Sequence, residues 1–344
     1  MQHHAARTRN RSRGASTIAA SMFGRMLLAL GCAIAAIAAL SPASAQGWPQ
    51  RSITFIVSQA AGSSPDVMAR LLADRLSKSL GQGVVIENKP GGATVVGATA
   101  GARAAPDGYT YFFATSAALS TNPFMIKSLG YDPVKDFSPV TLITRSHQLI
   151  VVHPDVPVKT MAELIATDKA APGKYSVGVD SPRSLAGVTA QAINKIAGMT
   201  MVLVPYPNIN SALQDAVAGR IQVGVFSESV VGALVGEGKL RAIAIASGRR
   251  SKLFPDLALV ADTLPGFDFS GWFMLMAPAG TPKEIIDKLG GEVAEAAKDA
   301  KLVEMAPKLG FEMEVNGPTA AAQFLKSQLD LWGRITKDLG IEPQ

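Results

Sequence analysis

The chain has 344 residues, 48% of them hydrophobic and 17% charged, with a formal net charge of +6 at pH 7. Residues 1–45 hold five of the 33 basic residues and no acidic one, so the remaining 299 residues carry 28 basic and 27 acidic side chains. No cluster of Lys and Arg with interleaved aromatic residues occurs, so we expect no nucleic-acid partner. The single cysteine, Cys32, lies in the same leading segment, so the rest of the chain must hold together without a disulfide.

Residues 1–45 have the features of a cleaved secretory signal peptide. A basic region precedes an apolar run, Met26–Leu40, and the small residues Ala43–Ala45 form a cleavage pattern. The apolar run is shorter than a membrane-spanning helix requires. The leader has no adjacent pair of arginines, so we expect Sec-type export to the periplasm. Both Met1 and Met22 are compatible with the true start.

The stretch Ser52–Leu80 predicts a strand, a loop of small residues and a helix. Its β-branched run, Ile53–Val57, has the length of a strand. Ser63 or Ser64 can cap the helix, and Gly81 can end it in a left-handed conformation. A helix start after such a loop presents unpaired backbone N–H groups, which favour anions such as carboxylates.

Strand-like and helix-like segments alternate after this unit. Val84–Ile86 and Tyr109–Thr115 are strand-like, and the small residues of Thr94–Ala105 predict a closely packed helix between them. Such alternation predicts a parallel sheet covered on both faces, with ligands bound outside the carboxyl ends of the strands. We therefore expect the ends at Val57 and Thr115 to lie on the same rim.

The alternation recurs in the middle of the chain, so we expect two α/β lobes. Residues 46–152 would form the first part of lobe 1, residues 153–266 would form lobe 2, and residues 267–344 would return to lobe 1 and end in helices. Two crossings between the lobes make a hinge, and a cleft between lobes is the default ligand site.

The chain after residue 45 lacks the residue patterns of common hydrolases and metal sites. Its two histidines, His147 and His153, match no carboxylate or cysteine pattern, and no G-x-S-x-G, H-E-x-x-H or G-K-[ST] motif occurs. His153 before Pro154 fits a strand end or the surface better than a catalytic base. We therefore expect a protein that binds its ligand without transforming it, and that uses no metal or cofactor.

Six segments in a fixed order resemble the solute receptors of tripartite tricarboxylate transporters, the Bug family, over essentially all of the chain after the leader. The segments are RSITFIVSQAAGSSPDVMARLLADRLSKSLGQGVVIENKPG, AAPDGYTYFFATSAALSTNP, YDPVKDFSPVTLI, VPYPNINSALQDAVAGRIQVGVF, GKLRAIAIAS and WFMLMAPAGTP. The resemblance implies the type II periplasmic binding-protein fold, with two α/β lobes joined by a two-crossing hinge. It also implies a receptor that captures a small organic acid or amino-acid-like solute and delivers it to membrane permease subunits. We expect a monomer.

The resemblance also implies where the ligand binds. Its carboxylate is expected on backbone and hydroxyl groups of the loops after the first and third strands, with Asp66 ordering the start of the first helix. The predicted ligand-binding residues are Ser58, Gln59, Ala60, Ala61, Gly62, Ser63, Ser64, Thr115, Ser116, Ala117, Asp180, Ser181, Ser184, Tyr206, Asn208, Ser227 and Glu228.

The chain departs from the family at positions that bear on ligand choice. Members commonly have three consecutive glycines in the first loop, where this chain keeps only Gly62 and has Ser63 and Ser64, which restrict the backbone but add hydroxyls. Glu228 stands where members often have asparagine. Facing the cleft, it would repel a second carboxylate and favour an amine or hydroxyl donor; alternatively it starts a helix and faces water. Arg183 could pair with Glu228, meet a ligand acid or be solvated.

Two other functions are compatible with the same residues. The receptor could present its ligand to a sensor kinase instead of a permease, because ligand binding would look the same in both cases. An exported hydrolase on a related scaffold would turn over its ligand, and the poor inventory of catalytic residues counts against it.

Overall fold

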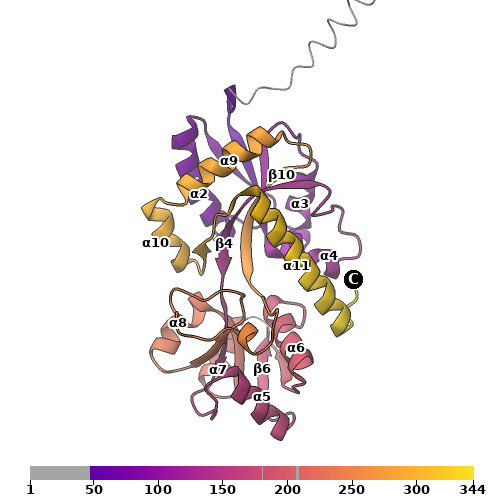
Figure 1. The fold of residues 1–344 in the computed structure, drawn as a ribbon, viewed down its shortest axis with the longest axis vertical. Coiled ribbons are helices and arrows are strands. Elements are labelled where there is room, and N and C mark those ends of the chain that lie inside the picture. Colours follow the sequence, from indigo (N-terminus) through magenta and orange to yellow (C-terminus); the bar gives the residue numbers. More distant parts are fainter. Residues whose placement is uncertain (1–46, 180, 207–208) are drawn as a thin grey trace, which may run out of the picture. The chain divides into compact units, whose positions relative to one another are not determined.

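The computed structural model describes residues 47–179, 181–206 and 209–344 (Figure 1). The predicted signal peptide lies outside these residues, and so do Asp180 and Asn208 of the predicted site. Among the described helices, none has the length and apolar character needed to cross a membrane. Residues 49–344 form one unit that contains two sheets, in agreement with the expected α/β fold.

The first sheet has six strands in the spatial order β11-β4-β10-β3-β1-β2. Their bounds are β1 (Ile53–Val57), β2 (Val84–Asn88), β3 (Thr110–Thr115), β4 (Phe137–Ser146), β10 (Gly271–Pro278) and β11 (Glu312–Met313). β1 is parallel to β2 and β3, but β10 is antiparallel to β3 and β4, and β11 is antiparallel to β4. The expectation of parallel strands is therefore confirmed for β1, β2 and β3, but the whole sheet is mixed, because β4 leaves toward the second sheet and β10 returns in the opposite direction.

Helices cover both faces of the first sheet. They are α2 (Ser64–Leu80), α3 (Val95–Ala102), α4 (Asn122–Met125), α9 (Lys283–Ala296), α10 (Ala300–Lys308) and α11 (Gly317–Leu339), with the short turns η2 (Gly92–Thr94) and η3 (Ala117–Thr121). α2 has the bounds that the sequence predicts. It buries Met68, Leu72 and Leu76 at helical spacing and ends at Gly81 in the left-handed conformation (φ +65°).

The second sheet has five strands in the order β7-β6-β8-β5-β9. Its elements are β5 (Gln148–Val152), α5 (Met161–Ala170), β6 (Ser176–Val179), α6 (Leu185–Ala197), β7 (Val202–Pro205), α7 (Ile209–Val217), β8 (Val223–Ser227), α8 (Glu228–Gly236), β9 (Arg241–Ile245) and the turn η4 (Val260–Asp262). β6 is parallel to β7 and β8, so the carboxyl ends of these three strands share a rim. β5 is antiparallel to β8 and β9.

Two chain segments connect the sheets. The outgoing segment is His147, which separates β4 from β5, and the return runs from β9 to β10. The two segments touch where the His147 Nδ1 lies 2.6 Å from the Ser247 hydroxyl. The return segment is also tied to the start of β5, because the Ala246 N–H donates to the Gln148 carbonyl (2.7 Å), and to itself, because the Phe269 N–H donates to the Ala246 carbonyl (2.9 Å). β5 pairs in the second sheet, so the chain changes sheets at His147, before the expected boundary at residue 152.

Helix α11 contacts the cores of both sheets (Figure 1). Its first half packs Ala321 and Leu325 against the first sheet. Its second half packs Trp332 into the core of the second, where the indole meets the Phe269 ring edge-on at 5.5 Å. Trp272, Trp332 and Phe226 are each no more than 2% exposed and pack in the core.

Candidate functional site

The loops after β1 and β3 meet at one rim of the first sheet, as the sequence predicts. Val57 of β1 is in register with Phe113 of β3, so the two strands end side by side. The Gln59 amide nitrogen lies 3.4 Å from the Thr115 hydroxyl and donates to it, and the Ser58 hydroxyl donates to the Gln59 side-chain oxygen (3.2 Å). The structure therefore brings these three predicted site residues together.

The next residues of the first loop form the turn that leads into α2. Ala60, Ala61 and Gly62 are exposed, and Gly62 has φ +84°, a conformation that glycine adopts without strain. Ser63 holds the N-cap position, but its hydroxyl donates to the Ala60 carbonyl oxygen (2.7 Å) instead of serving the first helical turn. Ser64, half-buried, is the first residue of α2.

Asp66 anchors this loop to the sheet. Its carboxylate, 2% exposed, accepts hydrogen bonds from the Gly62 N–H (2.8 Å), the Asn88 amide (2.8 Å) and the Arg70 Nε (3.0 Å). Asn88 also donates to the Gln59 carbonyl (3.1 Å). Burial acts to raise the pKa of Asp66, but the hydrogen bonds from Arg70, Gly62 and Asn88 outweigh it and hold the pKa below its usual value. The carboxylate thus orders the loop and stays ionised.

Helix α3 packs against the start of the same loop. A Cβ at Gly97 would lie 2.7 Å from the Ser58 Cα and 3.0 Å from the Lys89 carbonyl oxygen. The position therefore excludes every side chain, and the small residues of α3 let the helix approach the loop this closely.

The loop after β3 turns directly into a π-helical turn. Thr115 is 7% exposed, while Ser116 and Ala117 are half-buried at the start of η3. The Ser120 hydroxyl donates to the Ser116 carbonyl oxygen (2.8 Å), which fixes the backbone of the turn. The turn thus fixes the backbone of Ser116, the residue after Thr115, which contacts Gln59.

The predicted residues of the second sheet have local structural roles. Ser184 caps α6 by accepting from the Gly187 N–H (3.1 Å), and its own hydroxyl donates to the Ser181 carbonyl (2.8 Å). The Tyr206 hydroxyl donates to the Asp215 carboxylate (2.8 Å). Arg183 donates to the backbone carbonyl of Glu342. This bond to the C-terminal segment is none of the three alternatives that the sequence offered for Arg183.

Glu228 lines a cavity of about 330 Å³. The cavity is bounded by His147, Glu228, Ser229, Lys252, Leu253, Val303, Ala306, Pro307, Gly310, Phe311, Glu312 and Met313. Of the predicted site residues that the structure describes, Glu228 is the one in its wall. It is the first residue of α8, as one alternative expected, and it forms part of the wall of this cavity. Its neighbour Ser227 lies outside the lining and makes a hydroxyl–hydroxyl contact with Ser229 (3.0 Å).

Glu228 is half-buried, and one oxygen of its carboxylate, Oε2, is buried. Its Oε2 has no hydrogen-bond partner among the described residues. Burial raises the pKa of Glu228 above its usual value; a hydrogen bond from Ser251 opposes this shift, and the charge of Glu312 adds to it.

Sequence reasoning missed His147, which lines the same cavity. The imidazole is 3% exposed, and its Nδ1 lies 2.6 Å from the Ser247 hydroxyl. Its Nε2 is buried, lies 3.7 Å from the nearest Glu312 oxygen and makes no hydrogen bond within the described chain. Burial lowers the pKa of His147, the charge of Glu312 opposes this and that of Arg145 adds to it, so the ring is neutral at pH 7.

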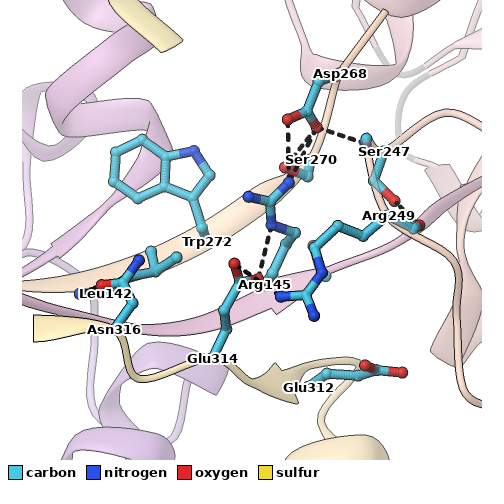
Figure 2. Close-up of polar contacts among 12 residues, drawn as sticks. Leu142, Arg145, Ser247, Arg249, Asp268, Ser270, Trp272, Glu312, Glu314 and Asn316 are labelled. Carbon is cyan, nitrogen blue, oxygen red and sulfur yellow. Dashed lines mark hydrogen bonds and ion pairs between the residues drawn. The ribbon is translucent and has the colours of Figure 1, made fainter. Parts of the chain in front are cut away.

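A buried arginine joins the two connecting segments to the C-terminal part of the chain. Figure 2 shows Arg145 of β4 between Asp268, which precedes β10, and Glu314, which follows β11; both ion pairs measure 3.0 Å. Asp268 also accepts from the Gly248 N–H (2.8 Å), and Arg249 pairs with Glu314 (2.9 Å). The sequence did contain a signal for these buried polar groups, since an arginine and a histidine lie inside the apolar run from residue 140 to residue 152. Such side chains are rarely buried without partners.

Metal binding finds no support in the described ranges. Residues 47–179, 181–206 and 209–344 contain no group of three or more His, Cys, Asp or Glu side chains placed to hold a metal ion.

Comparison with known proteins gives a consistent result. Residues 68–341 match the model of the tripartite tricarboxylate transporter family receptor. The chain is 31% identical over 318 residues to protein BugT of Bordetella pertussis, covering 92% of this chain and 98% of BugT. Among solved structures it is similar to Rpa4515 of R. palustris with adipate (29% identity, TM-score 0.68, 87% of this chain and 100% of that one). It is also similar to MatC of Rhodopseudomonas palustris with bound malate (28% identity, TM-score 0.63, 84% and 99%).

Proposed function

Because the chain belongs to the receptor family of tripartite tricarboxylate transporters, a family of periplasmic solute-binding proteins, we propose that it captures a small carboxylate-bearing metabolite. The carboxylate binds at the rim of the first sheet, on the loops after β1 and β3. The protein binds this ligand without transforming it, as the binding proteins of its family do.

The observation that carries the proposal is the anchored loop between β1 and α2. Asp66 and Asn88 hold Gly62 and Gln59 in place, so contacts within the protein order the loop. It leads into the N-terminus of α2, a helix of 17 residues, whose dipole and free N–H groups favour a negative charge. Ser64 begins α2 and Ser116 directly precedes η3, so both residues follow the strand ends at this rim, and their hydroxyls are of the kind that donates to a carboxylate.

The ligand class follows from this rim and from the relatives. The structures of Rpa4515 and MatC hold adipate and malate, which are both dicarboxylates. For this chain we propose a small organic acid or an amino-acid-like compound, with one carboxylate on the β1 and β3 loops. The predicted residues of the second sheet, Asp180, Ser181, Ser184, Tyr206, Asn208, Ser227 and Glu228, would close over its other end.

The test is calorimetric titration of the protein with a panel of small dicarboxylates, monocarboxylates and amino acids. At least one carboxylate should bind, and Ser116→Leu and Ser63→Leu should each weaken that ligand at least tenfold by blocking the rim. Ser79→Leu is the matched control, because Ser79 is exposed at the far end of α2. Unchanged affinity in both rim variants would overturn the assignment of the site.

We propose further that the receptor is exported by its cleaved signal peptide, works as a monomer, and delivers its ligand to the two membrane subunits of a tripartite permease. Uptake of the bound ligand by proteoliposomes that hold the permease should depend on adding this protein. Uptake that proceeds equally well without it would contradict the transport role and favour presentation to a sensor kinase.

A further inference from the structure

A surface groove lies between α4 and the second half of α11, which lie side by side in Figure 1. Residues 123–134 supply one wall and residues 329–337 of α11 supply the other, and the groove has a volume of about 730 Å³. Gly333 permits this close approach, because a Cβ there would lie 3.1 Å from the Phe124 ring. We call this feature the α4–α11 groove.

Apolar side chains line both walls of the groove. Phe124, Ile126 and Leu129 come from the first wall and Leu329 from α11, and all four are half-buried. Val134, in the first wall, is 62% exposed although its side chain is wholly apolar. Exposed apolar surface with polar residues around it is typical of an interaction site.

Three basic side chains of the groove have no acidic partner. Lys127, Arg334 and Lys337 are exposed, and none of them forms an ion pair within the described ranges. Long basic side chains lay their hydrocarbon stems along apolar surface and keep their charge in water. The groove therefore combines an apolar lining with positive charges that are free to meet an anion.

The two acidic side chains of the groove are already paired. Asp132 pairs with Lys135 (3.0 Å) and accepts from the N–H groups of Val134 (2.9 Å) and Lys135 (3.0 Å). Asp330 pairs with Lys326 (2.6 Å) on the exposed face of α11. The chain after residue 45 is nearly neutral, with 28 basic and 27 acidic side chains, so the unpaired positive charge is a local feature. It favours a partner of negative charge.

The shape of the groove favours a peptide over a small molecule. Sites for small molecules enclose most of the surface of their ligand, whereas the α4–α11 groove is open to solvent. Peptide segments bind in such grooves with apolar anchors against the lining, and charged contacts at the edge select the partner. None of the predicted ligand-binding residues that the structure describes belongs to the lining.

We propose that the α4–α11 groove docks an acidic segment of a partner protein, with apolar side chains between its acids. The apolar side chains pack against Phe124 and Leu329, and the acids meet Lys127, Arg334 and Lys337. The groove is separate from the carboxylate site on the β1 and β3 loops, and the proposal does not depend on that assignment. Helix α11 also packs into the core of the second sheet, so the docked segment contacts a helix that both sheets share.

The experiment is calorimetric titration of the protein with three acetylated, amidated hexapeptides in which leucine alternates with glutamate, glutamine or lysine. The glutamate peptide should bind at least tenfold more tightly than either of the other two. Its affinity should fall at least fivefold between about 0.1 M and about 1 M salt, because the Debye length shortens from about 10 Å to about 3 Å.

Two single variants and their combination locate the peptide. Lys127→Gln and Arg334→Gln should each weaken the glutamate peptide at least threefold, and the double variant should weaken it at least tenfold. Lys159→Gln is the matched control, because Lys159 is exposed, lies outside the groove and forms no ion pair in the described chain. Carboxylate binding at the β1 and β3 loops should be unchanged in all of these variants.

Three results of these titrations would overturn the proposal: equal affinity for the glutamate and glutamine peptides, no binding of the glutamate peptide by wild type, or unchanged affinity in the folded double variant. Loss of peptide binding in Ser116→Leu would also overturn it, because the acids of the peptide would then bind at the β1 and β3 loops.

Two further measurements test other occupants of the groove. The protein should not sediment with phosphatidylglycerol vesicles; sedimentation that the double variant abolishes would assign the groove to a membrane surface and overturn the proposal. Analytical ultracentrifugation should show a monomer, and a dimer that the double variant dissociates would assign the groove to a second copy and overturn it as well.

Discussion

The anchor of the β1–α2 loop can be tested by replacing Asp66 with asparagine. The side chain is 2% exposed and accepts from Gly62, Asn88 and Arg70. Asn has nearly the same shape, but its amide group presents two hydrogens where the carboxylate accepted. At least one of the three donors then loses its acceptor, and the loop loses its tie to the sheet.

The expected loss of stability can be worked out from these contacts. A hydrogen bond to a charged group contributes about 1.5–3 kcal/mol, and the Gly62 and Asn88 bonds are of this kind. The Arg70 side chain is 50% exposed, so its pair with Asp66 adds only about 0–1 kcal/mol. Water can reach the exposed residues of the loop and recover part of the loss. We expect Asp66→Asn to lower the free energy of unfolding by about 3 kcal/mol, or roughly 5–10 °C in Tm.

The assay is equilibrium urea denaturation of Asp66→Asn beside Asp74→Asn. Asp74 lies on the same helix in an exposed pair with Lys78 (2.8 Å), so its variant should stay within about 0.5 kcal/mol of wild type. The folded-state pKa of Asp66 lies below the usual value of 3.8, so its contribution is present above that pH and is lost as pH falls below it. The gap between wild type and Asp66→Asn should therefore be constant from pH 5 to pH 7 and shrink below about pH 4.

Equal stability of Asp66→Asn and Asp74→Asn at pH 7 would refute this reasoning. So would unchanged carboxylate affinity in a folded Asp66→Asn protein, because the loop that binds the carboxylate would then not need its anchor.

Three further predictions concern the connecting segments, the cavity and α3. Arg145→Met leaves Asp268 without its buried partner and should lower the free energy of unfolding by about 3 kcal/mol. Urea denaturation measures this loss, and a loss below about 1 kcal/mol would contradict the stabilising role of the ion pairs. Glu228→Gln should raise Tm at pH 8 but not below pH 4.5, because burial penalises only the ionised carboxylate; an equal gain at both pH values would contradict the raised pKa. Gly97→Ala should weaken carboxylate binding about tenfold by displacing Ser58. The control is Gly291→Ala, which has open space around its Cβ and should stabilise α9 slightly. Equal carboxylate affinities of the two variants would contradict the packing argument.

The sequence by itself determined the elements that depend on near neighbours. The β-branched run Ile53–Val57 and the helix Ser64–Leu80 have the predicted bounds, because residue periodicity and the left-handed Gly81 act within a few positions of the chain. Thr160 caps α5 by accepting from the Glu163 N–H (3.2 Å), the role in which threonine is favoured directly before a helix. The order of the six segments also pointed to the receptor family that the family model matches.

The tertiary structure decided which distant residues meet. Arg145 reaches Asp268 and Glu314, which are 123 and 169 positions away in the chain, and no local pattern marks those acids as its partners. The mixed first sheet has the same origin, since the pairing of β10 with β3 and β4 depends on how the chain returns from the second sheet. The direction of Glu228 could not be read from the sequence either. A helix start explains its charge locally, but the segment from Val303 to Met313 that closes the cavity over it arrives only through the pairing of β11 with β4.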